Sequence, residues 1–218
     1  MKKTRIVLPA VFVLLSACTA SPPPAETTAD GLARVPSSSD GGVYRRLDVD
    51  FTRFKLLMIE PLTVEFRESW RKQHPDVSSA EVHRLEAETM TSFHDAFTNI
   101  LVGEGPFELA EVRDADVMVV VPRLLDLNIP APETESDTGF RSYSPRAISM
   151  EMTGELRDGV SGEVLLRVIV VEPEDRIKFN QVPGPNRLAN AREIRNTMEK
   201  WSRLVREAID VAKTSKPH

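Results

Sequence analysis

The stretch from Ala147 to Arg157 alternates between apolar and polar residues, and this pattern constrains the fold more than any other feature of the sequence. The apolar positions are Ile148, Met150, Met152 and Leu156. The polar positions between them are Ser149, Glu151, Thr153, Glu155 and Arg157. Because successive side chains of a strand point to opposite faces, the pattern predicts a strand with one buried and one solvated face. We therefore expect a sheet that is covered on one side only.

Two other stretches repeat their apolar residues at helical spacing. The first opens at Ser78, with Glu81 in the position that completes a capping box, and runs to about Val102. The second is predicted to run from Asn190, as its cap, to about Lys213. Since the sheet has one face to cover, both helices are expected to pack on that face.

Apolar runs bounded by turn residues predict the remaining strands. These runs are Phe54–Glu60, continued past a kink at Pro61 to Phe66, then Phe107–Val112, Asp116–Leu127 and Glu163–Val171. With the alternating strand, the order is β-α-β-β-β-β-α. The predicted class is α/β: a two-layer sandwich in which two main helices pack on one face of a mixed, largely antiparallel sheet.

The first 17 residues have the features of a secretory signal. Basic residues precede the twelve-residue apolar run Ile6–Ala17, which is too short to cross a bilayer as a helix, since about 20 residues are needed. The run ends in Leu15-Ser16-Ala17-Cys18, which resembles the bacterial lipobox. The resemblance implies cleavage between Ala17 and Cys18 and lipid attached to Cys18. Several acyl chains give a stable membrane anchor where one does not.

Composition suggests how the rest of the chain is divided. Residues 18–42 are rich in Pro, Ser, Thr, Ala and Gly without an apolar period, and are expected to form a disordered tether after the lipidated cysteine. Residues 43–218 are expected to form a single globular domain. Thr19 follows the lipidated cysteine where an inner-membrane lipoprotein of Gram-negative bacteria has aspartate. The resemblance therefore implies the outer membrane, with the domain facing the periplasm.

Charge narrows the range of partners. Residues 1–17 hold three of the 28 Lys and Arg residues and no acid, which leaves 25 basic against 33 acidic residues. An acidic chain lacks the cationic footprint that nucleic acid requires and the polybasic segment that attracts anionic lipid. We therefore expect no nucleic-acid partner, and membrane attachment through the lipid on Cys18 alone.

Several short stretches match one known family. They are Asp50–Phe54, Glu60–Pro61 with Val64, Arg157–Asp158, Gly162–Leu165 and the carboxy-terminal helix with Trp201. Together they resemble the bacterial lipoprotein family catalogued as domain of unknown function 3313, over roughly residues 44–212. The resemblance implies a membrane-anchored envelope protein and brings no activity with it.

No metal, cofactor or catalytic motif is predicted. His83 and His94 share a helix face but stand about 16 Å apart at 1.5 Å per residue, too far to share an ion. Ser69 and Lys72 match the S-x-x-K of penicillin-binding enzymes, but the other motifs of that class do not follow.

Two pairs of acids were also considered as candidates for glycosidase-like chemistry. Asp114 with Asp116, and Glu60 with Glu65, lie at the ends of predicted strands. Acids in such places are usually solvated, so the pairs are interpreted as surface residues.

The long polar segment Asn128–Arg146 holds the candidate partner-binding residues Phe140, Arg141 and Tyr143, because aromatic and arginine side chains are enriched at binding hot spots. The segment is also a candidate to shield Val117–Val121, which is apolar on both sides of its strand.

The leading hypothesis is a non-catalytic binding or accessory module of the cell envelope that contacts another envelope protein. One alternative is a periplasmic enzyme, a hydrolase, that uses Ser69 and Lys72 or a carboxylate pair. The other is a small-ligand-binding lipoprotein with a pocket between sheet and helices.

The anchor can be tested directly. Labelled palmitate should enter the wild-type protein and should not enter Cys18→Ser, because only the thiol at this position accepts the lipid. The variant should remain as precursor or leave the membrane fraction. Label retained in Cys18→Ser would rule out the lipid anchor at this residue.

Overall fold

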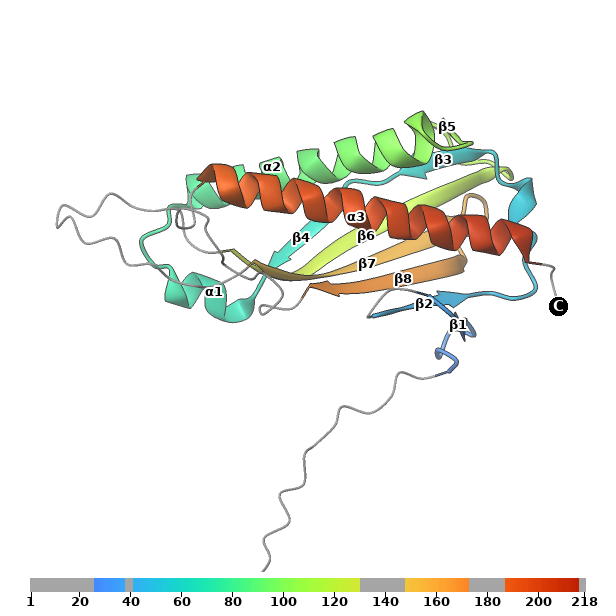
Figure 1. Ribbon diagram of the computed structural model, residues 1–218, viewed down its shortest axis with the longest axis horizontal. Coiled ribbons are helices and arrows are strands. Elements are labelled where there is room, and N and C mark those ends of the chain that lie inside the picture. Colours follow the sequence, from blue (N-terminus) through green and yellow to red (C-terminus); the bar gives the residue numbers. More distant parts are fainter. Residues whose placement is uncertain (1–25, 38–40, 130–147, 173–186, 216–218) are drawn as a thin grey trace, which may run out of the picture.

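Strand β6 (Val117–Asn128) is central to an eight-stranded sheet in the computed structural model, which describes residues 26–37, 41–129, 148–172 and 187–215. The strand order is β1-β2-β8-β7-β6-β3-β5, where β5 (Glu108–Leu109) is a two-residue edge strand, and β4 also pairs with β6. Strand β6 is antiparallel to β7 (Ser149–Asp158) and parallel to β3 (Leu56–Ile59). Helices cover one face of this sheet, so the predicted α/β class with two layers is confirmed (Figure 1).

The kink predicted at Pro61 divides one edge of β6 between two short strands. Strand β3 pairs with the first part of β6, and β4 (Thr63–Phe66) pairs with a later part, from Arg123 to Leu127. Both pairings are parallel. Proline has no N–H to donate to the neighbouring strand, so the pairing along β6 is interrupted at Pro61, as predicted.

The β7–β8 hairpin also forms as predicted. Strand β8 (Val164–Glu172) follows a turn in which the Asp158 carboxylate accepts hydrogen bonds from the backbone N–H groups of Val160 (2.9 Å) and Ser161 (2.8 Å). Burial opposes the charge of Asp158, but these hydrogen bonds and the nearby Arg53 lower its pKa. Gly162 closes the turn with φ +72°, a conformation that favours glycine.

The predicted tether is wrong from residue 26 onwards. Residues 26–37 belong to the folded domain, where Leu32 is fully buried and β1 (Ala33–Val35) pairs with β2 (Gly42–Arg45). Strand β2 in turn pairs antiparallel with β8 and so extends the sheet. The domain therefore begins before residue 43, and of the predicted tether, residues 18–25 and 38–40 lie outside the described part of the chain.

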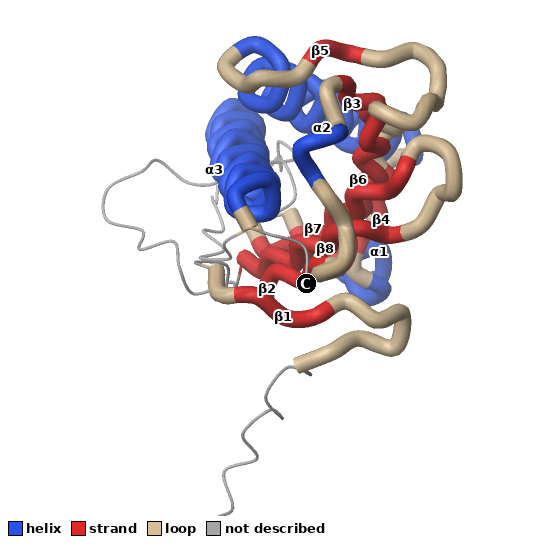
Figure 2. The backbone as a smooth tube through the Cα atoms, turned by 90° about the vertical axis from the view of Figure 1, so that its right-hand side faces the viewer, coloured by secondary structure: helices blue, strands red, loops and turns tan. Residues whose placement is uncertain are grey.

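Two helices pack on the inner face of the sheet, on the same side (Figures 1 and 2). Helix α2 (Ser79–Phe97) begins where predicted, with the Ser78 hydroxyl accepting a hydrogen bond from the Glu81 N–H at 3.2 Å. A π-helical turn, Thr98–Gly103, continues it to the predicted glycine stop. Helix α3 (Arg187–Thr214) begins three residues before Asn190, so Asn190 is not its cap. None of the described helices is long and apolar enough to cross a membrane.

The core lies between α3, α2 and the inner face of the sheet. The buried stripe of α3 consists of Ile194, Met198, Trp201, Val205, Ile209 and Ala212. The inward residues of β7 are Met150, Met152 and Leu156, all buried as predicted, while Glu151, Thr153, Glu155 and Arg157 are half-buried on the open face. Each large side chain buried in this core contributes about 1.5–3 kcal/mol to folding.

Short helix α1 (Glu68–Gln73) was not predicted. It holds Trp70, which is fully buried and donates a hydrogen bond from Nε1 to the carbonyl of Ile129 at 2.7 Å. The Trp70 ring lies against Phe66 and His74, with centroids 4.7 and 4.9 Å away. The helix thus ties the end of β4 to the end of β6. Six residues are too few to show a helical period in sequence.

The outward side chains of β6 are shielded at its start. Val117 and Val119 are fully buried although they point to the open face, and Val121 is half-buried. Arg157 lies opposite Val119 in the β6–β7 register. The backbone of Gly159 approaches Val117 so closely that an added Cβ would lie 2.7 Å from its carbonyl oxygen. The predicted shield, the segment after Asn128, lies outside the described residues from 130 to 147.

The unexpected amino-terminal strand leads to a stability prediction. Leu32→Ala should lower the free energy of unfolding by about 2–5 kcal/mol, because it removes a fully buried side chain. Leu47→Ala is the matched control, since Leu47 is about one-third exposed, and it should cost much less. Denaturant unfolding of the two variants measures the difference. Equal stabilities would mean that residues 26–37 are not part of the core.

Candidate functional site

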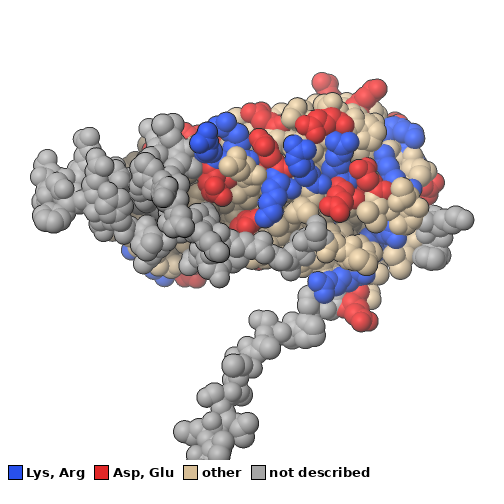
Figure 3. Space-filling view, viewed as in Figure 1, with Lys and Arg blue, Asp and Glu red and all other residues tan. Residues whose placement is uncertain are grey.

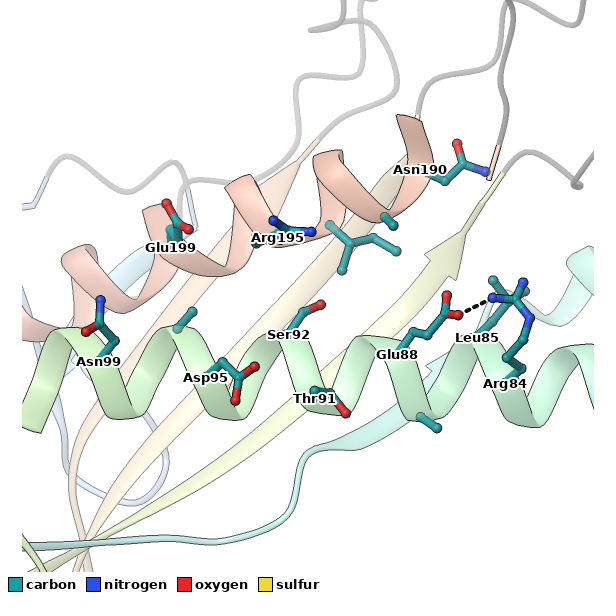
Figure 4. Close-up of a pocket in the computed structure, with 14 residues that line it drawn as sticks. Arg84, Leu85, Glu88, Thr91, Ser92, Asp95, Asn99, Asn190, Arg195 and Glu199 are labelled. Atoms are coloured by element: carbon teal, nitrogen blue, oxygen red, sulfur yellow. Dashed lines mark hydrogen bonds and ion pairs between the residues drawn. The ribbon is translucent and has the colours of Figure 1, made fainter. Parts of the chain in front are cut away.

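A groove runs between α2 and α3 on the helix-covered side of the domain, with a volume of about 710 Å³ (Figure 4). That volume is within the range of small-ligand and peptide pockets. Apolar side chains from both helices line part of it, namely Leu85, Ala96, Ala191 and Ile194. Polar side chains line the rest, namely Thr91, Ser92, Asp95, Asn99, Asn190, Arg195 and Glu199. No strand contributes to the lining, so the groove is not the predicted pocket between sheet and helices.

Arg84 fixes one end of the groove. Its guanidinium donates to Glu81 one turn earlier (Nε to Oε2, 2.8 Å) and forms an ion pair with Glu88 one turn later. The hydrogen bonds from Arg84 to Glu81, and next those to Glu88, raise the pKa of Arg84 although burial opposes its charge. Glu88 is therefore already neutralised and offers little charge to a ligand.

The α3 wall carries two charged side chains that have no partner among the described residues. Arg195 and Glu199 are exposed, and their side chains form no ion pair or hydrogen bond within the described part of the chain. On the α2 wall, Asp95 meets only the ring of His94, at 3.8 Å. In Figure 4, Ser92 and Arg195 lie on either side of the gap. Acidic and basic residues are interspersed over this face, without a patch of one sign (Figure 3).

The open face of the sheet carries a different kind of cluster. Arg167 on β8 bridges Glu155 on β7, at 2.8 Å, and Asp30 before β1, at 2.7 Å. Arg157 forms a second ion pair with Glu155. All four groups have their charges satisfied within the cluster. The arrangement therefore joins strands β7 and β8 to the amino-terminal turn rather than presenting a free charge.

Both acids of this cluster are held ionised. Hydrogen bonds from Arg167, and next from Thr28, lower the pKa of Asp30 to about 2. For Glu155, burial raises the pKa, but the hydrogen bonds from Arg157 and Arg167 outweigh it and lower the pKa overall. Neither acid is therefore suited to donate a proton near neutral pH.

The residues predicted for lipid anchoring and partner binding lie outside the described part of the chain. These are Ala17 and Cys18 at the predicted cleavage site and Phe140, Arg141 and Tyr143 in the predicted binding loop. The structure therefore tests neither the predicted cleavage site nor the predicted binding loop. The lipid anchor and the loop surface remain predictions from sequence.

Ser69 and Lys72 both lie on α1. The Lys72 ammonium is exposed and binds the Glu68 carboxylate at 3.3 Å. A lysine that activates a serine must lose its proton, which requires burial or a nearby cation. Lys72 is instead exposed and lies beside a carboxylate, so it lacks both of these features.

The acids and histidines considered from sequence occupy surface positions. Glu60 forms an ion pair with Arg113, and Glu65 with Arg123 at 3.1 Å. Asp114 is exposed and accepts a hydrogen bond from the next N–H. His83 and His94 are exposed on α2. Among the described residues, no three His, Cys, Asp or Glu side chains are grouped so that they could hold a metal ion.

The groove was missed by sequence reasoning, although a signal for it exists. On α2, Ser92, Asp95 and Asn99 recur at spacings of three and four beside the apolar stripe. Two helices predicted on one face of a sheet must flank each other, and small or polar residues at their seam leave a gap. That argument needs the facing residues of α3, and only the structure identifies them.

No family model matches the chain, and no curated protein matches it. Among solved structures, it is similar to a neuraminyllactose-binding hemagglutinin homolog from Helicobacter pylori at 10% identity, TM-score 0.36, over 77% of this chain and 94% of that one. Two structures of PelC dodecamers from Paraburkholderia phytofirmans match at 13% identity with TM-scores of 0.35 and 0.34. They cover 73% of this chain, and 95% and 93% of theirs. Similarity at this level carries no functional conclusion.

The open-face cluster gives a pH-dependent prediction. Arg167→Met should lower the Tm at pH 7 by roughly 2–4 °C, because it leaves Glu155 and Asp30 without their shared partner. The folded pKa of Asp30 lies below its unfolded value of about 3.9. The ion pair between Arg167 and Asp30 therefore stabilises the folded state above about pH 4, and this stabilisation is lost as the pH falls towards 2.

Thermal unfolding from pH 7 to pH 2 measures this dependence. Arg123→Met is the matched control, because its partner Glu65 is exposed and such pairs contribute little. A loss that is equal at pH 7 and pH 2 would mean that packing, rather than charge, accounts for the effect of Arg167.

Proposed function

We propose that this protein is a lipid-anchored, non-catalytic module of the cell envelope that binds another envelope protein through the α2–α3 groove. The observation that carries the proposal is the sequence Leu15-Ser16-Ala17-Cys18 at the end of a short apolar run. Thr19 favours the outer membrane, and the resemblance of short stretches to the family of domain of unknown function 3313 favours an envelope role.

The early start of the folded domain supports a position close to the membrane. Glu26, the first described residue, follows Cys18 by eight residues. A chain of that length spans at most about 28 Å when fully extended. A lipid on Cys18 would therefore hold the domain within one domain diameter of the bilayer.

The location of the groove supports its use by a partner. The chain enters the fold beside β1, the strand at one edge of the sheet, whereas the groove lies between the helices on the other side of the view (Figure 1). With the anchor attached at the β1 edge, the groove would remain open to a protein of the periplasm.

The chemistry of the lining favours a polypeptide segment as the partner. Leu85 and Ile194 provide an apolar floor, and Arg195, Glu199 and Asp95 provide charges of both signs that lack a Lys, Arg or carboxylate partner in the described chain. A segment with an apolar face flanked by one acidic and one basic side chain would match this arrangement.

A photo-crosslinking amino acid placed at Ser92 tests the proposal in the full-length protein in its own membranes. The wild type should give a defined adduct with an envelope protein. Arg195→Glu should reduce the adduct at least tenfold, because it places a like charge against the acid of the partner. Mass spectrometry of the adduct identifies the partner.

Arg192→Glu is the control, since Arg192 is exposed on the same helix but does not line the groove. An unchanged yield with Arg195→Glu would exclude the groove as the binding surface. Replacing Phe140, Arg141 and Tyr143 by alanine tests the predicted loop in the same assay. Loss of the adduct in that variant alone would assign binding to the loop.

A further inference from the structure

Arg45 on β2 is a buried cation that has no counter-ion among the described residues. Its side chain is only 8% exposed, and its Nε is buried without a hydrogen-bond partner. Its one contact is from Nη1 to the carbonyl oxygen of Ala212 near the end of α3, at 3.5 Å, the outer limit of a hydrogen bond. No Asp or Glu of the described chain lies within 4 Å of the guanidinium, and burial lowers the pKa of Arg45.

A buried charge of this kind is unusual. Moving an ion out of water costs several kcal/mol unless a partner of opposite charge compensates. Other arginines of the sheet have carboxylate partners: Arg157 and Arg167 bind Glu155, and Arg123 binds Glu65. The carbonyls at the carboxyl end of α3 carry a partial negative charge, which offsets only part of this cost.

A small crevice gives access to Arg45. It lies between the β1–β2 hairpin and α3, and its volume is about 30 Å³. Its walls are mainly apolar, formed by Val35, Val43, Leu204, Ala208 and Val211, with Ser37 and Glu207 also in the lining. Since about 10–15 Å³ of such space accommodates one water molecule, the crevice holds about two waters or one small ion.

We propose that Arg45 binds a small monovalent anion, of the size of chloride or formate, in this crevice. The anion would supply the counter-charge that the described residues do not, and it would accept a hydrogen bond from the Nε, which has no partner among them. The small volume favours an ion smaller than sulfate, and Glu207 in the lining disfavours a multiply charged ion. Glu207 itself makes no ion pair with Arg45.

Binding there would have a structural consequence. The anion would hold the β1–β2 hairpin against α3, beside the point where the chain enters the fold. This inference is independent of the α2–α3 groove, which shares no lining residue with the crevice.

Chloride NMR linewidths of the full-length protein in detergent test the proposal. The wild type should broaden the chloride signal, and formate should reverse the broadening by competition. Arg45→Met should abolish it. The control Arg34→Met removes an exposed arginine from the same hairpin and should leave the broadening unchanged.

Thermal unfolding gives a second readout. Raising chloride from well below the Kd to about five times the Kd should increase the wild-type Tm by about 2–4 °C more than that of Arg45→Met. Comparing the two proteins removes the general effect of salt. Sulfate at equal ionic strength should give no such difference.

Broadening that persists in Arg45→Met, or that formate does not reverse in the wild type, would overturn the proposal. If Arg45→Met does not fold, Arg45→Lys keeps the charge without the planar fork, and the broadening should fall several-fold. A wild-type protein without excess broadening would overturn the proposal whatever the variants do.

Discussion

Burial of β6 on both faces is the constraint on which the rest of the structure depends. Val117 and Val119 point away from the helices and are nevertheless fully buried, while Met118 and Val120 lie in the core on the other side. A strand of this kind needs neighbours along both edges and cover on both faces. Strands β3 and β4 supply one edge and β7 the other, α2 and α3 cover the inner face, and the β7–β8 turn closes over Val117.

Sequence patterns predicted the parts of the fold that repeat over many residues. The alternation from Ile148 to Arg157, the stripe of α2 and the interruption at Pro61 all correspond to the structure. Strands β1 and β2 and helix α1 were missed because three to six residues are too few for a period. They depend on tertiary contacts: β2 pairs with β8, and Trp70 of α1 packs with Val82 and Leu85. Composition around Leu32 indicated a tether, although Leu32 is fully buried.

The candidate binding surfaces were less accessible to sequence reasoning for a related reason. Predicting a groove between two helices requires knowing how both helices are rotated about their axes. A buried arginine cannot be distinguished in sequence from an exposed arginine of a strand, because its partners are not known. Arg45 on β2 and Arg167 on β8 are far apart in sequence but lie on neighbouring strands of the sheet, yet among the described residues Arg45 has no carboxylate partner and Arg167 has two. Only tertiary geometry separates these cases.

The division of one sheet edge between β3 and β4 also affects how the domain opens. Strand β4 hydrogen-bonds to the late part of β6, and Trp70 of α1 is bonded to Ile129 just beyond it. Strand β3 pairs only with the first part of β6, so β4 and α1 share no backbone pairing with β3. Amide protons of β4 can therefore exchange with solvent through a local opening that leaves the β3–β6 ladder closed. The same break that proline imposes on the strand thus allows one end of the sheet to fluctuate without global unfolding.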